Sequence, residues 1–234
     1  MKAMILAAGE GRRMRPLTDV KPKALLEVAG RPLIEHHIAR LSAAGFSEIV
    51  VNVSHLGQQL VNFLGDGSQW RVAISISAEQ TPLETAGGII QALPRLGDEP
   101  FLLVNGDVFT DYPLAELRET APFDRGAHIV LVPNPDHHPL GDFALQDDRV
   151  GQLPSIETVV GDSMVVTYSG IGVYAPALFA DSAPGRQPLK PLLDEAIARA
   201  SLSGELYEGM WEDVGTPQRL TALNQKFPSD SANQ

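Results

Sequence analysis

The chain has 234 residues, 44% of them hydrophobic, and a formal net charge of −11. This length is enough for one large α/β domain with a sizeable core, and the acidic balance argues against broad nucleic-acid binding. The absence of cysteine excludes disulfides, thiol nucleophiles and cysteine zinc sites. No apolar run approaches a membrane span, and the N-terminus enters a strand directly, without the layout of a signal peptide. We therefore expect a cytoplasmic protein that does not bind membranes.

The first predicted strand, Ala3–Ala7, runs into a glycine-rich turn. Gly9 and Gly11 lack a Cβ, so their backbone can approach a ligand and present a nest of N–H groups to anionic oxygens. Met14 stands where the third glycine of a dinucleotide fingerprint would be, and no Gly-Lys-Ser/Thr follows as in a Walker A motif. In an acidic protein, the cations that follow this turn point to a polyphosphate site: Arg12, Arg13, Arg15, Lys21 and Lys23.

Strands and helices alternate through the first half of the chain, which predicts a parallel sheet with crossover helices. The loop Glu79–Gly88 leads into a helix that runs through Leu93, and the apolar run Phe101–Val104 has the pattern of a central parallel strand. The other predicted helices are Leu33–Ala44, Leu56–Leu64 and Leu114–Thr120, and the other strands are Glu48–Val53, Val72–Ser77 and His128–Val132.

The second half has weaker patterns. Residues 146–164 show no clear periodicity, and the strand Val165–Tyr174 is interrupted at Ser169-Gly170. Thr216 can cap a final helix whose first residue is Pro217. We predict one domain over residues 1–227 and a polar tail over 228–234, with these further segments: a loop at Pro133–Pro139, a helix at Leu189–Ala200, and a short strand and loop at Glu205–Asp213.

Asp107 follows the apolar strand directly, in the sequence Asn105-Gly106-Asp107. A carboxylate there would lie beside phosphates held by the glycine turn, because the carboxyl ends of parallel strands share one edge of the sheet. Carboxylates with open water positions suit Mg²⁺. The alternative is that Asp107 is only a turn residue.

The order Gly-x-Gly-x-Arg-Met-x-Pro-Leu-Thr, followed by Pro22-Lys23, resembles the signature of the sugar-1-phosphate nucleotidyltransferases. Three later stretches also resemble that family: Pro82–Gly87, Asn105–Asp107 and Asp213–Pro217. Two departures are visible. Arg12 stands where many members have threonine, and Glu84 stands at the usual glycine of the base-recognition loop.

The resemblance implies a Rossmann-like α/β fold, with a mixed, mostly parallel sheet flanked by helices and no C-terminal β-helix. It also implies an enzyme in which Arg13 binds the leaving phosphates, Lys23 stabilises the α-phosphate, and Asp107 and Asp213 hold Mg²⁺. The nucleotide-binding positions that it implies are Leu6, Ala7, Ala8, Gly9, Gly11, Glu79, Leu83, Thr85, Gly87 and Asn105. The sugar-binding positions are Gly141, Glu157, Ser169 and Gly170.

Within the family, the short chain and its motifs are most similar to uridylyltransferases, which implies UTP and an N-acetylated sugar 1-phosphate as substrates. The alternatives are a guanylyltransferase acting on mannose 1-phosphate or another hexose 1-phosphate, and a non-catalytic nucleotide-sugar sensor. Glu79 does not separate these alternatives, because a carboxylate can accept two hydrogen bonds from guanine or one from uracil N3–H. It can also be a solvated loop residue. We expect a monomer or a small homo-oligomer.

Overall fold

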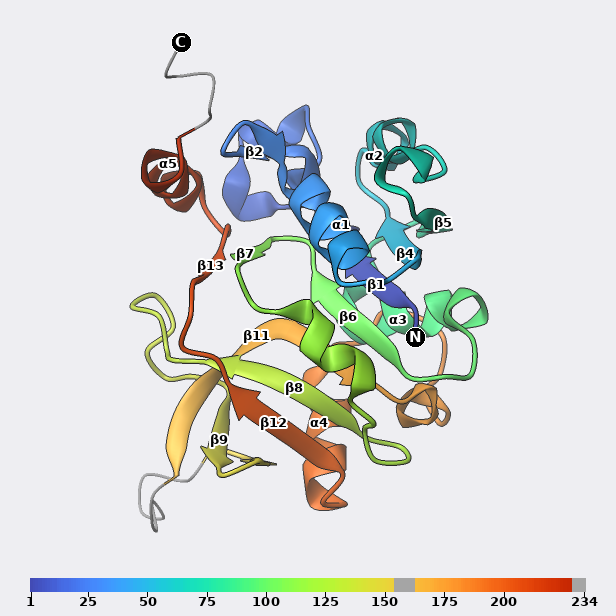
Figure 1. Ribbon diagram of the computed structural model, residues 1–234, viewed down its shortest axis with the longest axis vertical. Helices are drawn as coiled ribbons and strands as arrows, with labels where there is room; N and C mark the ends of the chain where they lie inside the picture. Colours follow the sequence, from blue (N-terminus) through green and yellow to red (C-terminus); the bar gives the residue numbers. More distant parts are fainter. Residues whose placement is uncertain (154–162, 229–234) are drawn as a thin grey trace.

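The computed structural model describes residues 1–153 and 163–228. Among these residues, nine strands form one sheet in the order β5-β4-β1-β6-β11-β8-β12-β10-β9 (Figure 1). The strands of this sheet are β1 (Ala3–Leu6), β4 (Glu48–Val53), β5 (Ala73–Ala78), β6 (Phe101–Asn105), β8 (Ala127–Val132), β9 (Phe143–Gln146), β10 (Arg149–Gly151), β11 (Met164–Tyr174) and β12 (Leu202–Leu206).

The half of the sheet that carries the N-terminal strands is parallel, as its alternation of strands and helices predicts. Strands β5, β4, β1 and β6 all pair in parallel, whereas β11 is antiparallel to both β6 and β8. Strand β12 returns to a parallel pairing with β8, and β10 and β9 complete the other edge in antiparallel pairings. The predicted mixed α/β sheet is confirmed.

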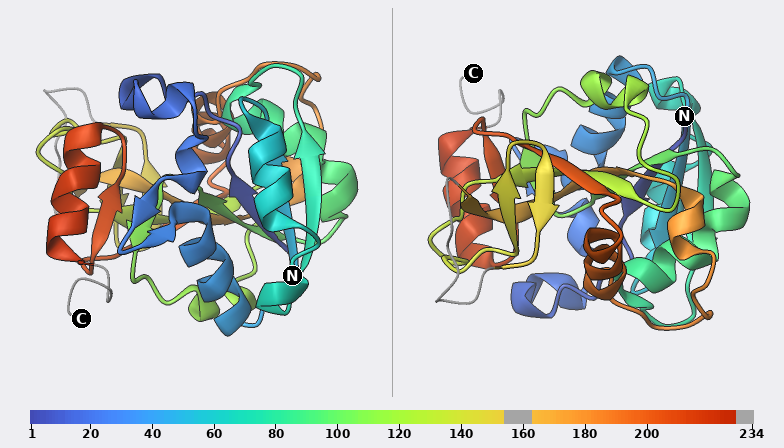
Figure 2. Two further views of the ribbon diagram at one scale, coloured as in Figure 1. Left: turned by 90° about the horizontal axis from the view of Figure 1, so that it is seen from above. Right: turned by 90° about the horizontal axis from the view of Figure 1, so that it is seen from below.

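Helices cover both faces of the sheet (Figure 2). Ala3 and Ile5 of β1 belong to the buried cluster that includes α1 (Leu33–Ala43) and α2 (Gly57–Leu64), whereas Met4 belongs to the cluster that includes α3 (Glu84–Leu96) and α4 (Lys190–Ala198). Alternate side chains of a strand point to opposite faces, so one short apolar strand supplies both cores.

The last helix, α5 (Pro217–Lys226), forms a third packed region at the side of the sheet. Leu220 and Leu223 of α5 are buried with Met14 and Leu33. The amide of Asn224 donates to the carbonyl oxygen of Glu27, beside the small hairpin of β2 (Glu27–Val28) and β3 (Arg31–Pro32) (Figure 1). This packing fixes the segment before α5, where β13 (Trp211–Asp213) pairs with β7 (Val108–Thr110).

Three details differ from the sequence predictions. Residues 146–164 contain strand β10, which forms a hairpin with β9. Helix α3 begins at Glu84, inside the predicted loop, and the segment Leu114–Glu119 is a 3-10 helix. The remaining 3-10 helices are Arg12–Met14, Leu17–Asp19, Lys23–Leu25, Ser68–Trp70 and Pro176–Phe179.

The predicted interruption of β11 is confirmed, because its register against β8 shifts between Tyr168 and Ile171. Thr216 caps α5 with Pro217 at the first helical position, also as predicted. The polar tail lies almost wholly outside the described residues. No helix within residues 1–153 and 163–228 is long and apolar enough to cross a membrane.

Candidate active site

A cavity of about 740 Å³ opens at the carboxyl ends of the parallel strands. Leu6 at the end of β1 is in register with Asn52 of β4 and with Asn105 of β6, so the carboxyl ends of three strands lie side by side. This is the edge where open α/β sheets bind ligands. Predicted site residues that line the cavity are Leu6, Ala7, Ala8, Gly9, Gly11, Lys23, Glu79, Leu83, Thr85, Asn105 and Asp107.

The glycine turn after β1 has the conformation that its glycines allow. Gly11 has a φ of +61°, and a Cβ there would lie 2.9 Å from Cγ2 of Thr18. The hydroxyl of Thr18 donates to the carbonyl oxygen of Gly11 at 2.9 Å, which closes the turn. Arg12 lines the cavity and pairs with Glu10, whereas Arg13 is exposed and is not among the lining residues. Of the cations predicted to form a polyphosphate site, Arg12 and Lys23 line the cavity, and the other three do not.

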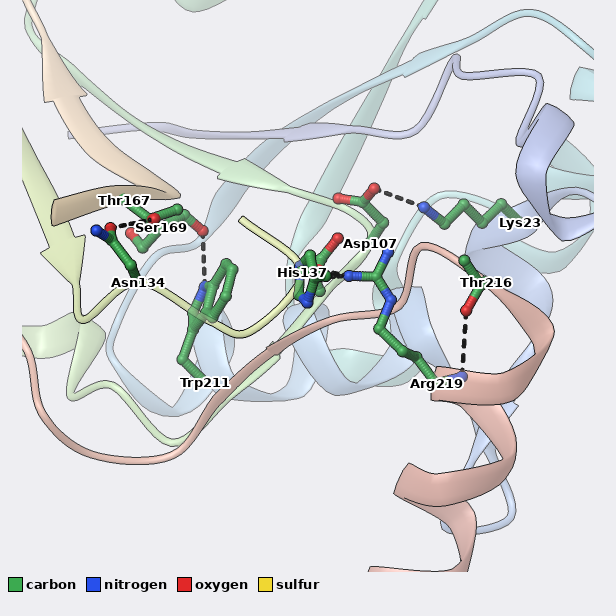
Figure 3. Close-up of polar contacts among 10 residues, drawn as sticks. Lys23, Asp107, Asn134, His137, Thr167, Ser169, Trp211, Thr216 and Arg219 are labelled. Carbon is green, nitrogen blue, oxygen red and sulfur yellow. Dashed lines mark hydrogen bonds and ion pairs between the residues drawn. The ribbon is translucent and has the colours of Figure 1, made fainter. Parts of the chain in front are cut away.

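Lys23 and Asp107 form an ion pair inside the cavity, with Nζ 2.6 Å from Oδ2 (Figure 3). The Lys23 side chain is 14% exposed. Burial opposes ionisation of the carboxyl, but the charge and hydrogen bond of Lys23 hold the pKa of Asp107 below its usual value. The site therefore contains a fixed cation and an ionised carboxylate at the end of β6.

Glu79 is 6% exposed, and both of its carboxylate oxygens have partners in the chain. Oε1 accepts from the side-chain amide of Asn52 at 2.7 Å, and Oε2 accepts from the backbone N–H of Leu83 at 2.9 Å. Asn52 in turn accepts from the N–H of Ala7. Burial raises the pKa of Glu79, although these hydrogen bonds oppose the shift. Glu79 therefore connects the predicted base loop to the glycine turn through Asn52. The alternative prediction, that Glu79 is a solvated loop residue, is wrong.

Glu84, which stands at the family's usual glycine position, has a φ of +62°. Its backbone keeps the left-handed conformation that favours glycine. Its carboxylate pairs with Arg186 at 2.5 Å, and both residues line the cavity. Gly87, a predicted nucleotide-binding residue, instead packs against the segment that carries Arg186, because a Cβ on Gly87 would lie 2.2 Å from the carbonyl oxygen of Gly185.

Asp213 lies beside Asp107 in the backbone, because the N–H of Val214 donates to the carbonyl oxygen of Asp107 at 2.8 Å. Its carboxylate does not line the cavity. Oδ1 accepts from Nη1 of Arg219 and lies 2.8 Å from Nε2 of His137. Figure 3 shows Arg219 reaching back from α5 toward His137. Sequence reasoning missed both residues, although the loop Pro133–Pro139 and the final helix were recognised.

The predicted sugar-binding residues lie next to this cluster. Gly141 has a φ of +62°, and a Cβ there would lie 2.8 Å from the carbonyl oxygen of Val166. Gly170 packs on Asn105, whose Oδ1 is buried without a hydrogen-bond partner among the described residues. The carbonyl oxygen of Ser169 accepts from the indole N–H of Trp211 at 2.9 Å. Glu157, also predicted to bind sugar, lies outside the described residues.

Comparison with known proteins agrees with this architecture. The family model for nucleotidyl transferases matches residues 2–230. An N-acetylmuramate α-1-phosphate uridylyltransferase of Neisseria meningitidis is 49% identical over 225 residues, which cover 94% of this chain and 95% of the relative. A protein of the same name from Caulobacter vibrioides is 35% identical, with 96% of each chain covered.

Two further relatives are more distant. Mannose-1-phosphate guanylyltransferase 1 of Arabidopsis thaliana is 31% identical, over 98% of this chain and 67% of the relative. A solved Bacillus anthracis structure, described as a glucose-1-phosphate thymidylyltransferase, superposes with a TM-score of 0.82 at 22% identity and shows the same fold over 97% of this chain and 95% of the solved one. By its fold, its cavity and its sequence, the chain belongs to the nucleotidyl transferase family.

Proposed function

We propose that this protein transfers a uridylyl group from UTP to N-acetylmuramate 1-phosphate, giving UDP-N-acetylmuramate and pyrophosphate, in the recycling of cell-wall sugars. The observation that carries the proposal is the ion pair of Lys23 and Asp107. This pair lies in the cavity that the glycine turn and the predicted base loop also line. The choice of substrates is supported by the two relatives of that name, which this chain matches over nearly their full lengths.

In this reaction an oxygen of the sugar phosphate attacks the α-phosphorus of UTP. The bond to the β-phosphate breaks, and pyrophosphate leaves. Such a transfer depends on positioning and on neutralising charge rather than on an enzyme nucleophile. Lys23 would bind the α-phosphate, and Arg13 would bind the leaving phosphates from the exposed turn, next to Arg12 at the cavity wall.

Asp107 and Asp213 would hold Mg²⁺, which would supply charge neutralisation at the phosphates. Mg²⁺ needs one or two carboxylates when phosphates and water complete its octahedral shell. The two aspartates fit this requirement, because the pairing of β7 with β13 places them at neighbouring backbone positions. No group of three or more His, Cys, Asp or Glu side chains gathers within residues 1–153 and 163–228, so a cage made by the protein alone is not present there.

The nucleoside would lie toward Leu83 and Thr85, and Glu79 would hold this wall in place while one of its oxygens accepts from uracil N3–H. The N-acetylated sugar would lie beyond Asp107, against Gly141, Ser169 and Gly170. Support for the nucleoside position comes from the cavity lining, and support for the sugar position comes from the proximity of β11 to Asn105.

A pyrophosphate-release assay tests the proposal with purified full-length protein. UTP, GTP, dTTP and ATP are each paired with N-acetylmuramate 1-phosphate, N-acetylglucosamine 1-phosphate, mannose 1-phosphate and glucose 1-phosphate. We expect the highest kcat/KM with UTP and N-acetylmuramate 1-phosphate. A preference for GTP and mannose 1-phosphate would replace this proposal with the guanylyltransferase activity of the more distant relatives. Nucleotide-sugar binding without any turnover would favour a sensor.

A further inference from the structure

Three polar contacts lie next to Asp107, among residues that do not line the cavity (Figure 3). Trp211 of β13 donates to Ser169 of β11 at 2.9 Å. Thr167 of β11 donates to Asn134 at 2.8 Å, in the loop that also carries His137. The third contact lies at Asp213, two residues after Trp211 in β13, where His137 and Arg219 meet. Strand β11, strand β13, helix α5 and the loop 133–142 thus share one small region.

In the proposed reaction, the acceptor sugar phosphate would approach the nucleotide through this region. Both Thr81–Thr85, which follow β5, and Asp107, which follows β6, line the cavity, and because β4 and β1 lie between these two strands, the two groups mark the two ends of this row of strands. If the nucleoside lies at the first end and the α-phosphate at the second, the attacking sugar phosphate approaches from beyond Asp107. The backbone contact from Val214 to Asp107 places β13 and the start of α5 there.

The guanidinium of Arg219 lies in this region, where its side chain folds back over Gly215. A Cβ built on Gly215 would lie 1.9 Å from Nη2 of Arg219, so a side chain at residue 215 would displace the guanidinium from this position. The Arg219 side chain is 19% exposed. In the part of the chain that the structure describes, its side-chain hydrogen bonds all come from Nη1, to Asp213 and His137. The donors Nε and Nη2 make none there.

We propose that Arg219 binds the carboxylate of the acid sugar, and so selects a substrate with a lactyl ether over one without it. This inference rests on the proposed function. Guanidinium forms two parallel hydrogen bonds to a carboxylate, a geometry that an ammonium lacks. If Asp213 turns to Mg²⁺, Arg219 loses its partner carboxylate, and the carboxylate of the substrate replaces it.

The test compares N-acetylmuramate 1-phosphate with its lactyl amide and with N-acetylglucosamine 1-phosphate, all at saturating UTP. The proteins are the wild type, Arg219→Met, Arg219→Lys and Lys226→Met, the last of which removes a cation from the other end of α5 as a matched control. For Arg219→Met we expect KM for the acid sugar to rise about 10- to 100-fold, the usual effect of losing a hydrogen-bonded charge partner. KM for the other two substrates should change less than threefold. Arg219→Lys should recover only part of the loss, and Lys226→Met should match the wild type.

Equal losses on all three substrates would overturn the inference, because they would mean that Arg219 binds the phosphate or only braces Asp213. If Arg219→Met unfolds, the wild type still decides the question through the amide: equal KM for acid and amide would contradict recognition of the charge, whatever the variant does. Failure of the proposed function looks different, because the wild type would then show no turnover of N-acetylmuramate 1-phosphate with UTP.

Discussion

The ion pair of Lys23 with Asp107 connects the free protein with the proposed reaction. In the free protein Lys23 balances a carboxylate at 2.6 Å and keeps the pKa of Asp107 low. In the proposed reaction it would turn to the α-phosphate. A flexible ammonium suits this exchange, since it is a point charge on a long side chain with three rotatable donors.

We predict that Lys23→Ala lowers kcat by about 10²–10³, the usual effect of removing one preorganised charge partner. Lys21→Ala is the matched control, because Lys21 lies in the same segment but pairs with Glu27 at the surface. Steady-state kinetics at saturating substrates, with thermal unfolding of both variants, give the measurement. Near-normal kcat in a folded Lys23→Ala protein would rule out the catalytic role.

His37 of α1 gives the stability of the protein a pH dependence. It is 4% exposed, and burial together with the charge of Arg40 lowers its pKa from 6.5 to about 4, while Asp107 opposes the shift. The unfolded chain takes up a proton near pH 6.5, before the folded protein does. Stability is therefore fully present above pH 6.5 and falls as the pH drops toward 4.

We expect this histidine to cost the wild type roughly 3 kcal/mol of unfolding free energy over that range. His37→Leu should lack this component. Urea unfolding of both proteins at several pH values, compared as the difference between them, removes the carboxyl titrations that they share. A difference that stays constant with pH would show that His37 is not a buried neutral base.

At the residue scale, sequence reasoning located the cavity better than it assigned individual contacts. The glycine turn and Asp107 were predictable because each follows a strand of strong apolar pattern, and Lys23 was predictable from its place in the family motif. The engagement of both Glu79 oxygens was not predictable, since it depends on Asn52 from a different strand and on the backbone of Leu83. One local signal was available, because each of two apolar strands has an asparagine near its carboxyl end, Asn52 in β4 and Asn105 in β6.

At the scale of elements, the start of α5 links stability to the site. The hydroxyl of Thr216 accepts from the N–H of Arg219 at 3.3 Å, so the cap fixes the turn between Asp213 and Arg219. Thr216→Ala should lower the free energy of unfolding by about 1 kcal/mol and weaken the response of the enzyme to Mg²⁺. Thr221→Ala is the control, because its hydroxyl bonds only within α5, to the carbonyl oxygen of Pro217. Denaturant unfolding and Mg²⁺ titrations of turnover measure the two effects, and equal behaviour of the two variants would contradict the link.

Helices and strands with a strong periodicity of hydrophobic residues were predictable from the sequence. Elements that form only by pairing with neighbouring strands were not. Strand β4 and helix α1 have long apolar patterns and appear within a residue of the predicted bounds. Strand β10 has three residues and exists through its pairing with β9 and β12, so its own sequence carries little signal. Glu84 begins α3 in a conformation that favours glycine, which local propensity does not predict.

At the scale of the whole molecule, the ion pairs of Asp107 and Asp213 would couple the proposed binding of the nucleotide to that of the metal. The chain has a net charge of −11, yet each predicted metal-binding carboxylate has a cation as its partner. Asp107 pairs with Lys23, and Asp213 pairs with Arg219. These cations make both carboxylates poorer ligands for a metal until a phosphate draws a cation away.

Mg²⁺ and UTP should therefore bind with positive coupling. Mg²⁺ alone has to compete with Lys23 and Arg219 for the side chains of Asp107 and Asp213, and UTP alone brings about four negative charges toward the same two aspartates. When both ligands are present, the triphosphate attracts Lys23 away from Asp107, and the metal screens the carboxylates from the triphosphate. Each ligand therefore favours the binding of the other.

A ligand at 100 times its Kd stabilises the folded state by about 2.7 kcal/mol, which thermal unfolding readily detects. We expect the Tm shift with both ligands to exceed the sum of the two separate shifts. Asp213→Asn should abolish the excess, whereas Asp136→Asn, which removes an exposed carboxylate next to His137, should retain it. Additive shifts in the wild type, or an unchanged excess in Asp213→Asn, would show that Asp213 does not take part in binding the metal with the nucleotide.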